Sequence, residues 1–127
     1  MNGPRWLGVA GVAGATGVIA GAFGAHALKE TLEPDLLAIF DTGARYHLIH
    51  AVALLGVALL ALRDPGNVWL NRAGWAFLLG VGVFSGSLYL LALTGVRTFG
   101  GITPFGGAAL ILGWVMLVPA AREADSD

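Results

Sequence analysis

The sequence predicts an all-α integral membrane protein, a bundle of four transmembrane helices. Of the 127 residues, 57% are hydrophobic and only 12% are charged, whereas a soluble domain carries roughly a quarter charged residues. The apolar residues also form four long runs, each close to the length that crosses a hydrocarbon core of about 30 Å. Because a segment in lipid must satisfy its own backbone hydrogen bonds, each run is expected to be a helix.

A single transmembrane domain, residues 1–127, is predicted, with helices over 6–27, 44–62, 73–95 and 103–121. The first 20 residues of the first run, from Trp6 to Ala25, carry no charge and would form about 30 Å of helix. The segment Arg63-Asp64-Pro65-Gly66-Asn67 predicts a turn,. Thr103-Pro104 predicts a capped helix start with proline at the first helical position,.

A short interfacial segment is predicted between the first two helices. Pro34 can open a helix there, with apolar residues on one side and acidic residues on the other,. The first run also has a second interpretation as a secretory signal peptide, with Arg5 before it and small residues flanking His26,. The length of its apolar part favours a retained transmembrane helix.

Basic residues predict how the chain is oriented in a cell membrane. Four helices place both termini on one side, and that side carries four arginines, Arg5, Arg63, Arg72 and Arg122. The other side carries Lys29, Arg45 and Arg97. Since the cytoplasmic side holds the excess of basic residues, both termini are predicted to be cytoplasmic. Aromatic belts are expected at the two boundaries, from Trp6, Trp69 and Trp75 on the cytoplasmic side and from Tyr46, Phe99 and Phe105 on the other,.

Several classes of function have no support in the sequence. The net charge is −1, whereas a nucleic-acid-binding protein needs a basic surface. There is no cysteine, so disulfides, thiolate catalysis and cysteine metal sites are excluded. No nucleophile with a positioned base is evident. We therefore predict no catalytic residues, no metal site and no cofactor, and expect a protein that is not an enzyme.

The 20 glycines predict close helix packing. Gly17 and Gly21, followed by Ala25, form a small-residue stripe, and Gly82 and Gly86 form another. Packing rather than hydrophobicity drives helix association in lipid, so such stripes let helix backbones approach. The stripes are expected to pack within one bundle, and contact with a second copy or another membrane protein is the alternative. The lipid bilayer is the other predicted partner.

The second helix predicts the one polar cluster of interest. Its strictly apolar part, 51–62, has 12 residues, about 18 Å of helix, which is too short to span the bilayer. The helix must therefore include 44–50, which draws histidines below the headgroups. His26 should reach the same level from the first helix. The predicted cluster comprises His26, Tyr46, His47, His50 and Ser87.

Three interpretations of this cluster remain open. Neutral histidines can hydrogen-bond between helices and lock the fold, at about 0.6 kcal/mol per bond. The cluster can handle protons or bind a ligand, since histidine titrates near physiological pH. A metal site is the weakest interpretation, because two histidines three residues apart are few ligands. Asp41 and Arg45, four residues apart, can form an ion pair,, or Arg45 can extend to the interface without a partner.

Four segments resemble one known family. They are Gly21-Ala22-Phe23-Gly24-Ala25-His26-Ala27-Leu28, Tyr46-His47-Leu48-Ile49-His50-Ala51, Phe84-Ser85-Gly86-Ser87-Leu88-Tyr89 and Ile102-Thr103-Pro104-Phe105-Gly106-Gly107. In this order they resemble the YgdD-like family, catalogued as domain of unknown function 423. The resemblance implies a small multi-span protein of the bacterial inner membrane and supplies no biochemical activity.

Two functions are expected from these observations. The first is a non-enzymatic scaffold or accessory subunit of a membrane complex, which requires only helix packing and exposed small-residue faces. The second is a small proton-coupled transporter or ligand-binding membrane protein that uses the outer-leaflet histidine, tyrosine and serine side chains.

Overall fold

The chain folds into four long helices joined by short connections. The structure is a computed structural model that describes residues 1–126. The helices are α1 (Gly3–Ala25), α2 (Pro34–Arg63), α3 (Val68–Thr94) and α4 (Thr103–Ser126), with a 3-10 turn, η1 (Arg97–Gly101), before α4. All four are long and apolar enough to cross a membrane. The described residues contain no strand, which confirms the predicted all-α membrane class.

Two helices, α1 and α3, begin before the predicted limits for local chemical reasons. α1 begins at Gly3 because the side chain of Asn2 accepts a hydrogen bond from the backbone N–H of Arg5, 3.0 Å away. α3 begins at Val68 because the side chain of Asn67 accepts from the backbone N–H of Trp69, 3.2 Å away. Such caps satisfy donors that the first helical turn leaves free.

The predicted interfacial segment is the first part of α2. Pro34 occupies the first helical turn, where its missing N–H removes no bond,. The helix then continues without a break for 30 residues, about 45 Å. Phe40 and Gly43 are buried within this part, so contact with the neighbouring helices holds it in line with the rest of α2.

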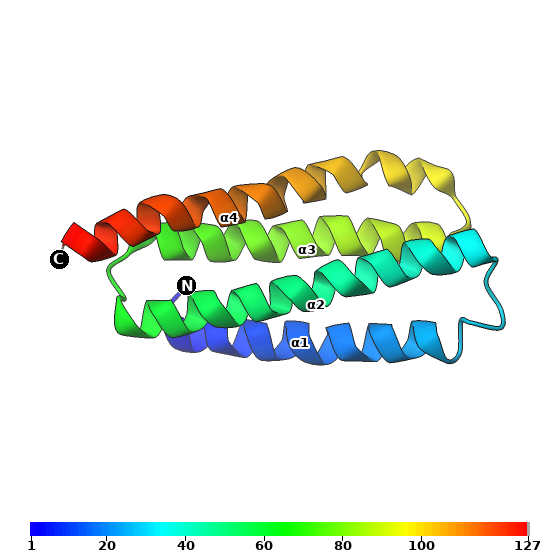
Figure 1. Ribbon diagram of the computed structural model, residues 1–127, viewed down its shortest axis with the longest axis horizontal. Coiled ribbons are helices and arrows are strands. Elements are labelled where there is room, and N and C mark those ends of the chain that lie inside the picture. Colours follow the sequence, from blue (N-terminus) through cyan, green and yellow to red (C-terminus); the bar gives the residue numbers. More distant parts are fainter. Residues whose placement is uncertain (127) are drawn as a thin grey trace.

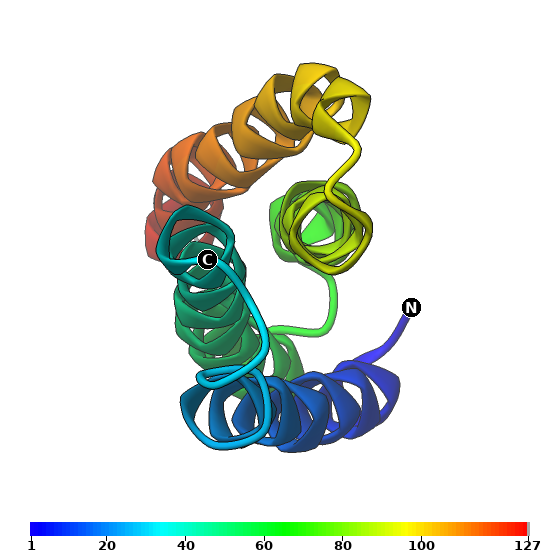
Figure 2. The same cartoon turned by 90° about the vertical axis from the view of Figure 1, so that its right-hand side faces the viewer.

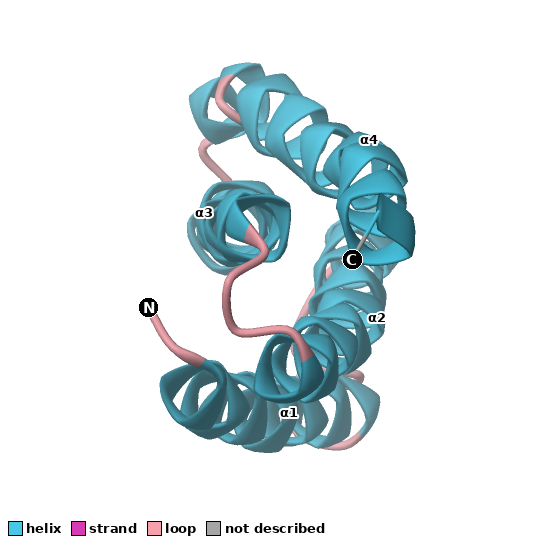
Figure 3. Ribbon diagram, turned by 90° about the vertical axis from the view of Figure 1, so that its left-hand side faces the viewer, coloured by secondary structure: helices cyan, strands magenta, loops and turns pink. Residues whose placement is uncertain are grey.

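Helices that follow one another in the chain pack against one another. The main contacts join α1 with α2, α2 with α3, and α3 with α4. Both termini lie at the same end of the molecule (Figure 1). Seen from either end, α1, α2 and α4 follow a curve, and α3 lies in its hollow (Figures 2 and 3). α1 and α3 are therefore not one of the main packed helix pairs.

The core contains two large aromatic rings, Trp6 in the first turn of α1 and Phe77 of α3. Phe77 and Trp6 are fully buried, with Leu54 and Val57 beside them. Trp6 was expected in an interfacial belt, but its ring packs on Gly74 of α3 and its indole Nε1–H donates to Asn71 Oδ1, 3.1 Å away. These two contacts bury Trp6 and join α1 to α3.

The glycines divide into packed and open positions. Gly17 lies against Leu48 and His47 of α2, and Gly24 lies against Phe40. Gly17 and Gly21 of the α1 stripe therefore face Leu48 of α2 within the molecule, whereas Ala25 at the end of the stripe is exposed. By contrast, a methyl group added at Gly82 or Gly86 would meet nothing within 4 Å, so the α3 stripe is left open.

Candidate functional site

His47 joins three helices through its two ring nitrogens. Its Nδ1 lies 2.9 Å from the hydroxyl of Tyr89 on α3, and its Nε2 lies 3.1 Å from the hydroxyl of Thr16 on α1. The Thr16 hydroxyl donates to the backbone carbonyl of Val12, 2.8 Å away. With the hydroxyl hydrogen used there, Thr16 accepts from His47 Nε2–H, and Nδ1 accepts from Tyr89. The neutral ring therefore satisfies every donor in this network.

His50, one turn further along α2, forms a separate network. Its Nδ1 lies 2.7 Å from the backbone carbonyl of Tyr46. A carbonyl can only accept, so Nδ1 carries the hydrogen. Its Nε2 then accepts from the indole N–H of Trp114 on α4, 3.0 Å away. A proton on Nε2 would face that N–H, so these two partners hold His50 in one neutral tautomer.

The serines of α3 bond elsewhere. Ser87 lies 2.6 Å from the hydroxyl of Thr103 on α4 and donates to its own helix at the Phe84 carbonyl. Ser85 donates to the Gly43 carbonyl of α2, 2.7 Å away. Both serines are buried. The Ser87–Thr103 bond joins α3 to α4 and the Ser85–Gly43 bond joins α3 to α2, at about 0.6 kcal/mol each.

The structure divides the predicted cluster. His47, His50 and Ser87 are buried but lie in three separate hydrogen-bonded groups. The inclusion of His26 was wrong: α1 ends at Ala25, and His26 is an exposed residue that caps the helix with its backbone. Tyr46 contributes its carbonyl, while its half-exposed ring packs against Phe84, 4.8 Å between centroids.

The predicted ion pair between Asp41 and Arg45 is also absent from the described residues. Within residues 1–126 the only ion pair joins Asp35 to Arg97, with 2.5 Å between oxygen and nitrogen. It links the start of α2 to η1 across 62 residues of sequence. Arg45 is exposed, which fits the alternative in which it extends to the interface without a partner.

Two partners of the histidines were not identified from sequence. Thr16 is the only side chain with an O–H group between residues 7 and 25, and Trp114 was expected only to pack. Thr103 and Trp114 are likewise the only side chains with O–H or N–H groups in 103–121. Inside a membrane, an isolated polar side chain on an apolar helix needs a hydrogen-bond partner from another part of the protein. That requirement was the available signal for both residues.

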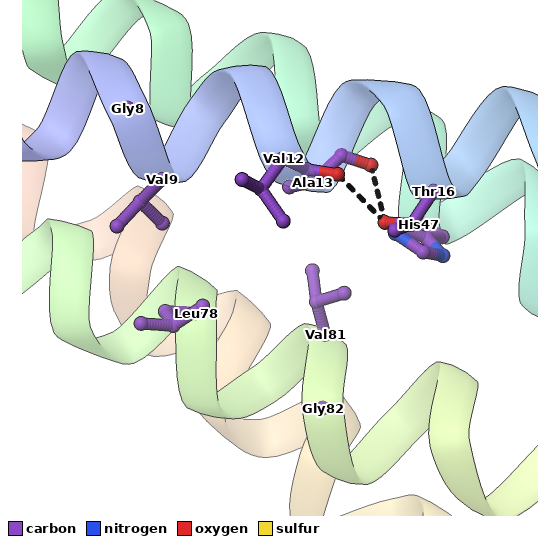
Figure 4. Close-up of a pocket in the computed structure, with 9 residues that line it drawn as sticks. All are labelled: Gly8, Val9, Val12, Ala13, Thr16, His47, Leu78, Val81 and Gly82. Atoms are coloured by element: carbon purple, nitrogen blue, oxygen red, sulfur yellow. Dashed lines mark hydrogen bonds between the residues drawn. The ribbon is translucent and has the colours of Figure 1, made fainter.

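A groove runs between α1 and α3, with His47 at its inner end. It has a volume of about 580 Å³ and is lined by Gly8, Val9, Val12, Ala13, Thr16, His47, Leu78, Val81 and Gly82. Valine side chains of α1 point across it toward Leu78 and Val81 of α3, while Thr16 and His47 lie together at one end (Figure 4). The groove is thus apolar apart from this pair.

The chemistry available here is hydrogen bonding and proton exchange at an imidazole. Within residues 1–126 no three histidine, cysteine, aspartate or glutamate side chains gather so that they could hold a metal ion. Thr16 and Tyr89 place hydroxyls on both nitrogens of His47. The groove therefore offers one polar contact point on an apolar wall.

Comparisons with known proteins agree with the family resemblance. A family model described as protein of unknown function (DUF423) matches residues 20–107. The UPF0382 membrane protein YwdK of Bacillus subtilis is 45% identical over 101 residues, which cover 80% of this chain and 82% of that protein. A UPF0382 membrane protein of Haemophilus influenzae is 41% identical over 122 residues, covering 96% of this chain and 97% of its own length.

The UPF0382 inner membrane protein YgdD of Escherichia coli is 39% identical over 114 residues, covering 89% of this chain and 86% of that protein. No solved structure matches the chain. With the family model covering most of the sequence, and with four helices of transmembrane length, the chain belongs to the DUF423 family of small membrane proteins.

Proposed function

We propose that this protein is a non-enzymatic accessory subunit that binds a transmembrane helix of another membrane protein in the groove between α1 and α3. The groove itself is the observation that supports this proposal. Its apolar walls carry no charged side chain, so it suits a segment that already lies in lipid.

Glycines at the two edges of the groove favour a helix as the occupant. A methyl group added at Gly8 on α1 or at Gly82 on α3 would meet nothing within 4 Å. Open small residues let a partner backbone approach closely, and close packing is what drives helix association in a membrane. Thr16 and His47 add a point at which a small polar side chain of the partner helix can bond,.

Site-specific crosslinking in native membranes tests this proposal. The chain has no cysteine, so a single cysteine carries a photoreactive label without background. Val12→Cys places the label in the groove, and Ile111→Cys on α4 is a matched control, because the two side chains are 67% and 65% exposed. The expected result is one discrete protein adduct from Val12→Cys, mapped by mass spectrometry to a transmembrane helix of the partner.

A blocking substitution makes the crosslinking result specific. Gly82→Leu fills the groove, whereas Gly56→Leu adds the same side chain at an open position of α2 outside it. The adduct should disappear with Gly82→Leu and persist with Gly56→Leu. Lipid adducts alone at both labelled positions, or an adduct with a second copy of this chain, would contradict an accessory subunit.

A small proton-coupled carrier is the second candidate. It is favoured by His47, an imidazole that lines the groove and bonds two hydroxyls. In proteoliposomes, such a carrier should show proton-linked flux that is lost with His47→Gln and retained with His26→Gln. Flux that is unchanged by His47→Gln would exclude this role for the groove.

A further inference from the structure

We infer that protonation of His47 opens the groove between α1 and α3, so that the groove is sensitive to pH. The inference concerns the state of the groove itself. Only its consequence for a bound partner rests on the proposed function.

The position of His47 makes it a bridge across the groove between α1 and α3. The main contacts of α1 are with α2, and toward this end of the groove His47 connects α1 to α3 through Thr16 and Tyr89. At the other end of the molecule, Trp6 and Asn71 make the corresponding connection. Changes at His47 can therefore move one end of the groove while the other end stays fixed.

A second proton on His47 disturbs the network on one side. The Thr16 hydroxyl can still accept from Nε2–H, because its own hydrogen goes to the Val12 carbonyl. Nδ1 would then also carry a hydrogen, and the Tyr89 hydroxyl could only accept from it. Within the described residues, Tyr89 has no other hydrogen-bond acceptor for its O–H. Protonation of His47 therefore reverses the direction of its hydrogen bond with Tyr89, the bond that joins His47 to α3.

The surroundings of His47 do not neutralise the added charge. Residues 6–25 of α1 contain no ionisable side chain. On α3, Tyr89 is the ionisable group that faces His47, and Arg72 lies in the second turn, near the opposite end of that helix. On α2 itself, Asp41 and Arg45 are exposed and lie nearer than His47 to the start of the helix at Pro34. Tyr46 and His50 lie on either side of His47 in the sequence. An imidazolium on an apolar wall is stabilised by water, which enters when the groove widens.

His50 serves as the internal contrast. It is also buried and lies one turn away on the same helix, yet its nitrogens face a carbonyl and an N–H. That pair accommodates only the neutral ring. The two histidines therefore differ in the partners that decide whether a second proton can be accepted.

Distance measurements by electron spin resonance test the inference on the purified protein in nanodiscs. Spin labels are attached at Ile19→Cys on α1 and Leu90→Cys on α3, two exposed positions that do not line the groove. Acidification from about pH 8 to pH 5, the range in which histidine titrates, should shift the distance distribution to longer values. The shift should vanish with His47→Gln, which stays neutral, and persist with His26→Gln.

NMR of the imidazole nitrogens provides a readout on the unsubstituted chain. The His47 resonances should change over this range, with His26→Gln and His50→Gln used to assign the three rings. A distance shift that survives His47→Gln, or His47 resonances that do not change over this range, would overturn the inference. Neither measurement requires a bound partner protein. A negative result here would therefore contradict the pH response of the groove without contradicting the proposed accessory subunit, which the crosslinking experiment tests.

Discussion

At the scale of single residues, two histidines of one helix have different roles because of their partners. His50 bonds a carbonyl and an indole N–H, which hold it in one tautomer, whereas His47 bonds the Thr16 hydroxyl, which accepts, and the Tyr89 hydroxyl, which can donate or accept,. Burial alone does not separate them, since their exposed fractions are 4% and 9%. Donor and acceptor identity therefore decides which imidazole can take part in proton chemistry.

Replacement of His50 should destabilise the protein more than replacement of His26. His50→Leu removes two hydrogen bonds and leaves the indole N–H of Trp114 without its acceptor, a loss of about 1–3 kcal/mol. His26 is exposed and makes only a backbone bond. Thermal unfolding in detergent should show a lower midpoint for His50→Leu and little change for His26→Leu. Equal midpoints would contradict this ranking.

Trp114→Phe should leave His50 Nε2 without its hydrogen-bond donor. The substitution keeps an aromatic ring beside Phe77, 5.1 Å from the Trp114 ring centroid, but removes the donor to His50 Nε2. NMR should then show a shifted His50 Nε2 resonance, because this nitrogen loses its donor while Nδ1–H stays bonded to the Tyr46 carbonyl. An unchanged Nε2 signal would contradict the bond between the two rings.

At the scale of helices, glycine positions report which faces are in contact. Gly80 and Gly82 lie two residues apart on α3 but face different surroundings. A methyl group at Gly80 would lie 2.6 Å from Leu110 Cδ2 of α4, whereas one at Gly82 would meet nothing within 4 Å. One face of α3 is therefore closed against α4, and the other faces the groove.

The two alanine substitutions should therefore have opposite effects. Gly80→Ala pushes α4 away from α3 and should cost about 1–3 kcal/mol, as overpacking does. Gly82→Ala adds helix propensity without a clash and should be neutral or stabilise by about 0.5–1 kcal/mol. Thermal unfolding of both variants in the same detergent measures the difference. Destabilisation by Gly82→Ala would contradict the open position of Gly82, because it would mean that other side chains of the protein occupy this part of the groove.

Much of the element level was predictable from sequence, for a physical reason. Uncharged runs of membrane-spanning length are expected to be helices, and the short apolar part of the second helix predicted that the helix includes His47 and His50, both of which are buried. The rotation of each helix about its axis was not predictable, because it is fixed by packing between distant residues. For this reason Thr16 and Trp114 were missed as partners, and His26 was wrongly included.

At the scale of the whole molecule, an even number of helices places both termini at one end (Figure 1). We expect that end to be cytoplasmic in the bacterial inner membrane, because it carries four of the seven basic residues,. The connection between α1 and α2 should then face the opposite side of the membrane from the connection between α2 and α3.

Cysteine labelling checks this orientation. Lys29→Cys lies in the connection after α1 and Gly66→Cys in the connection after α2, and both native residues are exposed. In spheroplasts, a membrane-impermeant maleimide should label Lys29→Cys directly and Gly66→Cys only after the membrane is permeabilised. The reverse pattern would place the termini outside the cytoplasm.

The anchoring of Trp6 also bears on the order of assembly. Its partners Asn71 and Gly74 belong to α3, and the bond to Asn71 spans 65 residues of sequence. During synthesis the first helix emerges from the ribosome long before those partners exist. Until the third helix enters the bilayer, this indole lacks both its hydrogen-bond acceptor, Asn71, and the Gly74 surface on which it packs. The central core of the protein can therefore close only late in translation, when the first and third helices meet.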